Sequence, residues 1–156
     1  MNIVRFTSLV IVLAALVPVQ AADPTTPIHW SAARTKELVT EAASKVNKQT
    51  GMSPQRFMDS AFMMYREKSS GAEIHTGSAD FIIVNDGEGT IVIGGKMLNG
   101  KLDRPGEIRG ESIDGGTPYA VRAGDTLYVP KNAPHQFLVE AGRHMVYTVV
   151  KVTPVE

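Results

Sequence analysis

The chain has 156 residues, no cysteine, and 16 lysines and arginines against 16 aspartates and glutamates. This length predicts a single domain. The balanced charge offers no electrostatic basis for binding nucleic acid or anionic lipid. Because cysteine is absent, disulfides, thiolate catalysis and sulfur-rich metal sites are excluded, so a hydrophobic core must stabilise the fold.

Residues 1–21 are typical of a cleavable signal peptide. Arg5 supplies a positive start, and residues 9–17 form an uninterrupted apolar run. Within Val19-Gln20-Ala21, small residues stand at the two positions that a signal peptidase inspects. The run is much shorter than the roughly 20 residues of a membrane span. We therefore predict cleavage after Ala21 or Ala22 and a periplasmic or secreted protein without stable membrane insertion. The alternative is a retained membrane anchor.

Residues 22–52 are predicted to form a linker followed by a helix. Residues 22–28 contain two prolines and two threonines, as an extended linker does. The helix is expected over residues 31–49, capped by Ser31 and followed by Gly51 in a left-handed conformation. Its apolar stripe is narrow, which predicts packing against the domain or against a partner subunit. The stripe consists of Leu38, Val39, Ala42, Ala43 and Val46.

Residues 53–156 predict an all-β domain, because short β-branched and aromatic segments alternate with glycine-rich turns. Such a pattern is typical of a sandwich, a jelly roll or a small barrel. Residues 96–116, rich in glycine and mixed charge, are expected to form either a lid or a long surface loop. The predicted turns are 85–89 and 141–142, and the predicted strands are 57–66, 73–75, 79–84, 90–93, 119–121, 126–129, 136–140 and 144–152.

The first group of chemically interesting residues is Glu73, His75 and Asp80. Glu73 and His75 are two apart on a predicted strand and so share a face. Residues 76–79 can turn the chain, which brings Asp80 beside them on the next strand. Asp80 opens an otherwise apolar stripe, where a lone carboxylate is costly unless it is paired or bound to a cation. Imidazole and carboxylate together suit zinc, manganese, iron, nickel or copper.

The second group surrounds His135. Pro130 and Pro134 stiffen the turn that precedes it, and Asn132 between them tolerates a positive backbone angle. A stiff turn fixes the point at which His135 enters its strand, as a preorganised metal ligand requires.

Together the two groups resemble the motifs of the cupin family, G-x5-H-x-H-x3-4-E-x6-G and G-x5-P-x-G-x2-H-x3-N. The resemblance is close over residues 73–87 and 124–139, and it extends in strand pattern over 57–152. It implies one cupin-type, jelly-roll-like barrel over 53–156 preceded by one N-terminal α-helix, and a homodimer paired through edge strands. The positions that match the motifs are His75, Asp80, Gly87, Gly124, Pro130 and His135.

The chain also departs from these motifs. Glu73 stands for the first histidine, Asp80 for the glutamate, Asn132 for a glycine and Val139 for the final asparagine, and Glu67 stands at the opening glycine. Glutamate keeps a ligand in place of histidine, whereas aspartate shortens the reach by one methylene. Asp80 is therefore left open as a direct ligand, a ligand through water or no ligand. The substitutions can also mark a cupin that has lost its metal.

The predicted site follows from the resemblance. The metal ligands are Glu73, His75, Asp80 and His135, and Glu73 and Asp80 are also the candidate catalytic general bases. A hairpin turn at residues 141–142 would set His135 opposite Thr148 and His144 roughly 13 Å away, so His144 is not expected to be a ligand. Tyr65, Arg66 and Tyr119 can enter the pocket, depending on strand parity. The expected pocket residues are Ile82, Val84, Val92, Phe137, Val146 and Thr148.

We expect a metal-dependent enzyme that acts on a small organic molecule, as an oxygenase, isomerase or lyase. The cofactor would be one divalent ion, Zn, Mn, Fe, Ni or Cu. Two alternatives remain open: a non-catalytic barrel that binds or senses a small molecule or a metal, and a metal-free structural barrel. Fold alone does not choose among them, nor does it give the substrate.

Overall fold

The computed structural model describes residues 25–153, so the predicted signal peptide and its cleavage sites after Ala21 or Ala22 lie outside the described residues. Within 25–153, no helix is long and apolar enough to cross a membrane. The elements are α1 (Ala32–Ser44), β1 (Met52–Met58), β2 (Ala61–Arg66), β3 (Ala72–His75), β4 (Ala79–Ile93), β5 (Lys96–Leu98), β6 (Lys101–Arg104), β7 (Glu107–Gly110), β8 (Ser112–Asp114), β9 (Thr117–Arg122), β10 (Thr126–Val129), β11 (His135–Leu138) and β12 (Met145–Val152).

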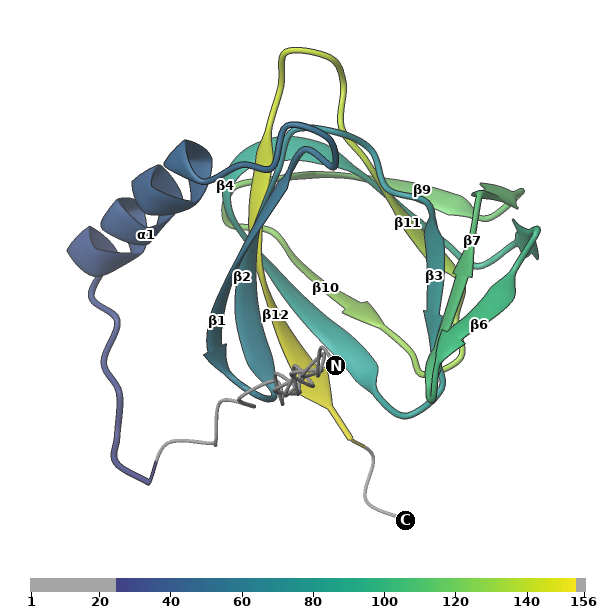
Figure 1. The fold of residues 1–156 in the computed structure, drawn as a ribbon, viewed down its shortest axis with the longest axis horizontal. Coiled ribbons are helices and arrows are strands. Elements are labelled where there is room, and N and C mark those ends of the chain that lie inside the picture. The colour runs from purple at the N-terminus through teal and green to yellow at the C-terminus, as the bar shows by residue number, and fades with distance from the viewer. Residues whose placement is uncertain (1–24, 154–156) are drawn as a thin grey trace, which may run out of the picture.

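Ten of these strands form one curled antiparallel sheet, in the order β1-β2-β12-β4-β11-β3-β7-β6, with β9 and β10 also paired to β4. Figure 1 shows the sheet wrapping around a central space, with α1 outside it. The predicted all-β barrel preceded by one helix is confirmed. The interior is filled by a cluster of buried apolar side chains contributed mainly by β4, β11 and β12.

Strand β4 joins the two halves of the barrel, and the predicted turn at residues 85–89 within it is wrong. The strand runs on through this segment with a bulge at Asn85: Val146 pairs with Asp86, but Tyr147 pairs with Val84. One extra residue reverses the alternation of side chains beyond it. Consequently Ile91 is buried in the interior cluster and Val92 is not part of it.

The predicted hairpin between β11 and β12 is also wrong. Strand β11 pairs with β3 and β4, whereas β12 pairs with β2 and β4. His135 therefore faces Glu73 and Ile93 rather than Thr148. The segment between them makes the predicted turn at residues 141–142, where the Arg143 amide donates to the Glu140 carbonyl at 3.0 Å. It then crosses over, so that the two strands lie in different parts of the barrel.

This crossover inverts the expected faces of β12. Tyr147 and Val149 join the interior cluster. Val146, predicted to line the pocket, is buried beneath the helix with Leu38. Thr148, also predicted there, donates its hydroxyl hydrogen bond to Asn85 Oδ1 at 2.7 Å.

Helix α1 packs against its own barrel. The sequence had left open whether it would pack there or against a partner subunit. Ser31 caps it by accepting a hydrogen bond from the Arg34 amide at 3.1 Å. The helix ends at Ser44 rather than residue 49, because Asn47 Oδ1 accepts the amides of Gln49 and Thr50 and so forms a turn. Gly51 has the predicted positive φ, 67°, but in the turn into β1 rather than at the helix end.

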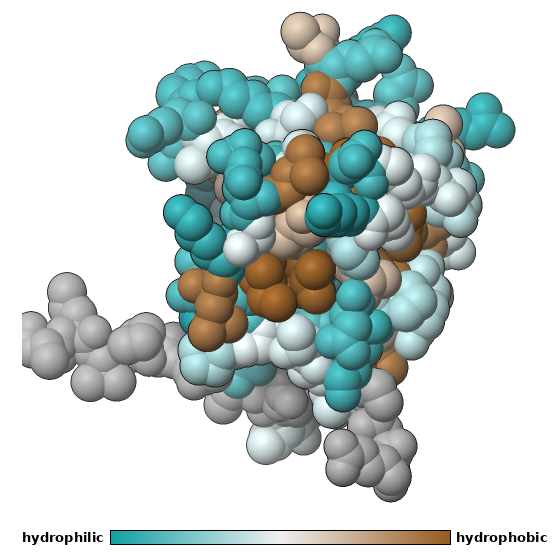
Figure 2. Space-filling model, turned by 90° about the vertical axis from the view of Figure 1, so that its right-hand side faces the viewer, coloured by the Kyte–Doolittle hydropathy of each residue, from teal (hydrophilic) through white to brown (hydrophobic). Residues whose placement is uncertain are grey.

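Two other segments differ from expectation. The segment predicted as one strand, 57–66, contains the end of β1 and all of β2, which form an antiparallel pair. The excursion 96–116 holds four short strands, of which β7 pairs with the free edge of β3 and β6 pairs with β7. The side of the molecule with β6 and β7 faces the viewer in Figure 2, where apolar groups gather near the middle, bordered by hydrophilic ones. The excursion is thus part of the barrel wall.

Candidate metal centre

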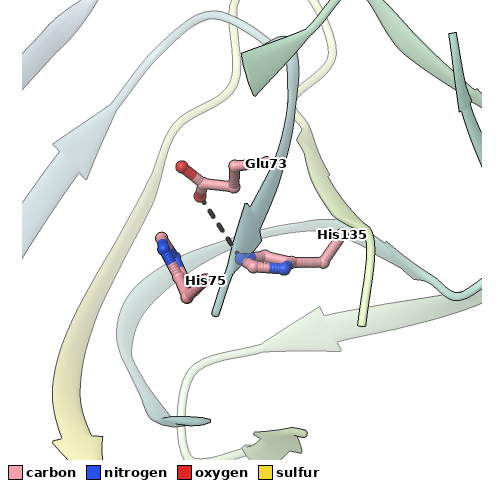
Figure 3. A group of neighbouring side chains, drawn as sticks. All are labelled: Glu73, His75 and His135. Atoms are coloured by element: carbon pink, nitrogen blue, oxygen red, sulfur yellow. Dashed lines mark ion pairs between the residues drawn. The ribbon is translucent and has the colours of Figure 1, made fainter. Parts of the chain in front are cut away.

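Three strands bring the four predicted ligands together inside the barrel. Glu73 and His75 lie on β3, Asp80 is the second residue of β4 and His135 is the first residue of β11. His135 is the cross-strand partner of Glu73, and the rings of His75 and His135 have centroids 5.0 Å apart. All four side chains are buried. Figure 3 shows Glu73, His75 and His135 turned toward one another.

His135 directs an unpaired nitrogen into this group. Its Nδ1 lies 3.1 Å from the Ala133 carbonyl, so Nδ1 carries the proton and donates. Its Nε2 lies 3.5 Å from Glu73 Oε1 and 3.8 Å from Asp80 Oδ2, and it has no hydrogen-bond partner among residues 25–153. The ring is 1% exposed, so no bulk water compensates this nitrogen. A buried lone pair that faces two carboxylates is suited to a cation.

His75 is held between two carboxylates. Its Nδ1 lies 2.8 Å from Glu107 Oε1, and its Nε2 lies 3.2 Å from Asp80 Oδ2. Burial lowers the pKa of His75, but the hydrogen bond and charge of Asp80 outweigh burial and raise it. While Glu107 accepts the Nδ1 proton, a metal ion that replaced the Nε2 proton would bind at Nε2.

The two acids of the site each have a cationic partner. Asp80 Oδ1 accepts a hydrogen bond from Lys151 Nζ at 2.7 Å, and Glu73 Oε2 is paired with Arg109. Burial by itself raises the pKa of Glu73, but the facing imidazole of His135 and the charge of Arg109 lower it to about 2. The pKa of Asp80 is also lowered, because His75 and Lys151 outweigh its burial. Both carboxylates are therefore ionised at neutral pH.

Glu73, His75 and His135 each offer one atom, and these atoms lie within 4.8 Å of one another. The Glu/His/His group could therefore hold a metal ion. Asp80 lies outside this group of three, although its Oδ2 approaches both imidazoles.

Three charged residues of the site, Glu107, Arg109 and Lys151, were not identified from the sequence. Glu107 and Arg109 lie two apart on β7 within the segment predicted to be a lid or loop, and Lys151 lies near the end of β12. The alternation Glu-Ile-Arg was a weak strand signal for the first two. Nothing local indicated that they would face Glu73 and His75, because that depends on the pairing of β7 with β3.

A pocket of about 340 Å³ leads to the site, and Glu73, His75 and Asp80 line it. Of the predicted pocket residues, Phe137 lines it, whereas Ile82 and Val84 belong to the closed core. Val92, Val146 and Thr148 lie elsewhere, because the bulge in β4 and the crossover before β12 turn them away. Five of the six residues expected to line the pocket are apolar, whereas polar and charged side chains make up much of the lining in the structure.

The other histidines lie apart from this group. His144 stacks on Tyr65 and places Nε2 2.9 Å from Asp86 Oδ2. His29 is exposed. The sequence left open whether Tyr65, Arg66 and Tyr119 face the pocket. Arg66 lines it, Tyr65 packs against the buried cluster beneath helix α1, and Tyr119 is 43% exposed.

The lowered pKa of Glu73 predicts how acid affects the metal-free protein. The pKa falls from a usual 4.5 to about 2 on folding, so its stabilising contribution is complete above 4.5 and is lost as pH falls through 2. We expect the unfolding free energy of chelator-treated protein to fall by on the order of 2–3 kcal/mol over this interval. Urea denaturation at several pH values measures it. Glu73→Gln should flatten this dependence, and an equally steep profile in that variant would contradict the assignment.

No protein-family model and no curated protein matches the sequence. Among solved structures, TT1209 from Thermus thermophilus is similar at 15% identity over 70% of this chain and 89% of its own, with a TM-score of 0.50. CapF, solved with the inhibitor 3-isopropenyl-tropolone, is similar at 13% identity over 70% of this chain and 30% of its own, also with a TM-score of 0.50. A cupin protein from Bacteroides fragilis is similar at 15% identity over 62% of this chain and 70% of its own, with a TM-score of 0.39.

This chain has the cupin-type fold that its sequence motifs predict: a curled antiparallel barrel, similar in fold to TT1209 and CapF. The curled antiparallel sheet and the meeting of the two motif regions inside it agree with the resemblance seen in the sequence. At these identities the similarity concerns the fold alone, and this chain spans less than a third of the length of CapF.

Proposed function

We propose that this cupin-type barrel binds one divalent cation through Glu73, His75 and His135. The observation that carries the proposal is His135 Nε2, a buried nitrogen without a hydrogen-bond partner among residues 25–153 that faces two carboxylates. Without a cation or a proton at this nitrogen, burying it there is costly.

The donor set fits a transition-metal ion. Two donors each about 2.1 Å from an ion in tetrahedral geometry stand about 3.4 Å apart, and His135 Nε2 and Glu73 Oε1 are 3.5 Å apart. Two imidazoles with one carboxylate suit zinc, iron, manganese, nickel or copper. In this proposal Asp80, already bound by Lys151, balances charge near the ion rather than acting as its first carboxylate ligand.

The reaction class we propose is metal-dependent chemistry on a small organic molecule that enters the pocket. The bound ion would supply a Lewis acid for a substrate oxygen. Phe137 and Tyr147, stacked with centroids 4.6 Å apart, form a rigid wall of that pocket. The chain's own contribution is to orient the substrate against this wall.

A second candidate, a binding or sensing barrel without turnover, is favoured by the state of the acids. Glu73 is held in an ion pair with Arg109 and Asp80 in an ion pair with Lys151, so neither carboxylate is free to accept a proton from a substrate. Neither Glu73 nor Asp80 is therefore well suited to the role of general base expected from the sequence.

Elemental analysis after separate loading with each of the five metals tests the proposal. About one bound equivalent per chain is expected with at least one metal, and none with any metal would favour the structural barrel. Turnover assays of the loaded protein on enolisable ketones, phenolic compounds and keto acids then separate an enzyme from a binder.

We also propose export and a homodimeric state, on the basis of the N-terminal sequence and of the exposed strand edges of the barrel. Protein expressed from the full sequence in bacteria should be recovered from the periplasm with Ala22 or Asp23 as its first residue. Mass spectrometry of the intact protein checks this, and a chain that retains residues 1–21 would contradict it. Light scattering measures the oligomeric state.

A further inference from the structure

Arg66 is a buried cation that faces the pocket without an anionic partner. It ends β2 with 4% of its surface exposed, and it lines the pocket together with Glu73, His75 and Asp80. Its Nε donates a hydrogen bond to the Tyr147 hydroxyl at 3.2 Å. Among residues 25–153, no carboxylate lies within ion-pair distance of its guanidinium group, and neither terminal nitrogen donates a hydrogen bond to a side chain or backbone atom.

The other cations closest to the candidate ligands are more exposed than Arg66, and yet both are matched, which makes Arg66 exceptional. Arg109 pairs with Glu73 and Glu107, and Lys151 pairs with Asp80. Arginine stays charged in proteins, and an isolated buried charge costs several kcal/mol. An unmatched guanidinium therefore indicates a place where an anion is bound in the working protein.

The surroundings hold the guanidinium in one orientation. Its central carbon lies 5.2 Å from the centroid of the Phe137 ring, which is itself stacked on Tyr147. The Tyr147 hydroxyl fixes Nε, so the two terminal nitrogens are presented together. A planar pair of N–H donors matches a carboxylate, which can accept two parallel hydrogen bonds.

The charges of the whole pocket also favour an anion. Its lining carries one more cationic side chain than acidic side chains, before any metal is bound. The cations are Arg56, Arg66, Arg104, Arg109 and Lys151, and the acids are Asp59, Glu73, Asp80 and Glu107.

We infer that the pocket binds a small molecule carrying a carboxylate, and that Arg66 holds this carboxylate through both terminal nitrogens. Phe62, Met64 and Val149 also line the pocket and provide apolar contact for the rest of the molecule. A volume of about 340 Å³ limits the ligand to a small acid. That the acid is a substrate rests on the proposed function, whereas its contact with Arg66 does not require the metal.

The test uses benzoate, pyruvate and acetate as carboxylate probes and benzamide as the uncharged analogue of benzoate. Calorimetric titration of the full chain, with and without metal, should show benzoate binding at least about 10-fold more tightly than benzamide. Arg66→Met should abolish this preference and leave benzamide affinity and metal content unchanged. Arg56→Met, at an exposed position on the same pocket, should keep the preference.

Three results would overturn the inference: equal affinity for benzoate and benzamide in the wild type, no binding of any of the three carboxylates, or an equal loss of preference in Arg56→Met. The first two need no variant, so they apply even if Arg66→Met fails to fold. Arg66→Lys, which keeps the charge but not the paired donors, should weaken benzoate binding by several-fold. Metal content is measured separately: carboxylate preference without metal binding would refute the proposed function alone, and metal binding without that preference would refute this inference alone.

Discussion

The His135→Ala protein is expected to bind divalent metal at least about 100-fold more weakly than the wild type. The substitution removes the one buried nitrogen that has no hydrogen-bond partner among residues 25–153, and it leaves a single imidazole beside the carboxylates. Competition with a metal-chelating dye measures the affinity, and elemental analysis after gel filtration measures the stoichiometry.

The matched control for this experiment is His144→Ala, which removes a histidine bound to Asp86 outside the candidate ligand group. It should keep the affinity and stoichiometry of the wild type. Thermal unfolding gives an independent result, because a ligand present at 100 times its Kd stabilises the folded state by about 2.7 kcal/mol. Added metal should therefore raise the Tm of the wild type and of His144→Ala but not that of His135→Ala. Equal stoichiometry in His135→Ala and the wild type would refute the proposed centre.

Gly87→Ala should be the most destabilising single-methyl substitution in the barrel. Gly87 has a φ of 71°, and a Cβ placed on it would lie only 2.1 Å from the His144 carbonyl oxygen. Backbone strain of about 1–2 kcal/mol adds to an overpacking cost of about 1–3 kcal/mol. The neighbour is a backbone atom and cannot rotate away. We expect a loss of about 3 kcal/mol of unfolding free energy, measured by urea denaturation.

Gly142→Ala separates the two contributions. Gly142 also has a positive φ, 79°, but a Cβ there would meet nothing within 4 Å. The loss of unfolding free energy in Gly142→Ala should therefore be limited to the backbone strain of about 1–2 kcal/mol. If both variants lose the same free energy, the close approach of Gly87 to His144 is not what requires glycine in β4.

Some features of this protein follow from local sequence, and these were predicted well. Strands β3, β10 and β12 agree to within one residue with the predicted segments 73–75, 126–129 and 144–152, because short runs of β-branched and aromatic residues between turn residues are a local signal. Ser31 was recognised as a helix cap because capping depends on a few adjacent residues. The meeting of His75 and His135 was predicted because two stiff motifs with family spacing carry information about a distant partner.

Tertiary structure alone decided the rest. The bulge at Asn85 reversed the faces of β4 beyond it, and the crossover after β11 reversed those of β12. Ile91 and Tyr147, rather than Val92 and Val146, therefore face the interior. Glycine-rich residues 85–89 look like a turn locally, but their pairing with β9 and β12 keeps them within the sheet.

The pairing of charges around the site was also decided by the tertiary structure. Arg109 and Lys151 neutralise Glu73 and Asp80, and Arg66 does not find a carboxylate among residues 25–153. Each of these relations joins strands that are distant in sequence, and the direction of a long cationic side chain is set by what surrounds it. The sequence by itself determined a barrel with two histidines in it, because strand alternation and motif spacing are local. Which acids are matched and which cation is left for a ligand was decided only when the sheet closed, because the energy of a buried charge depends on its partner.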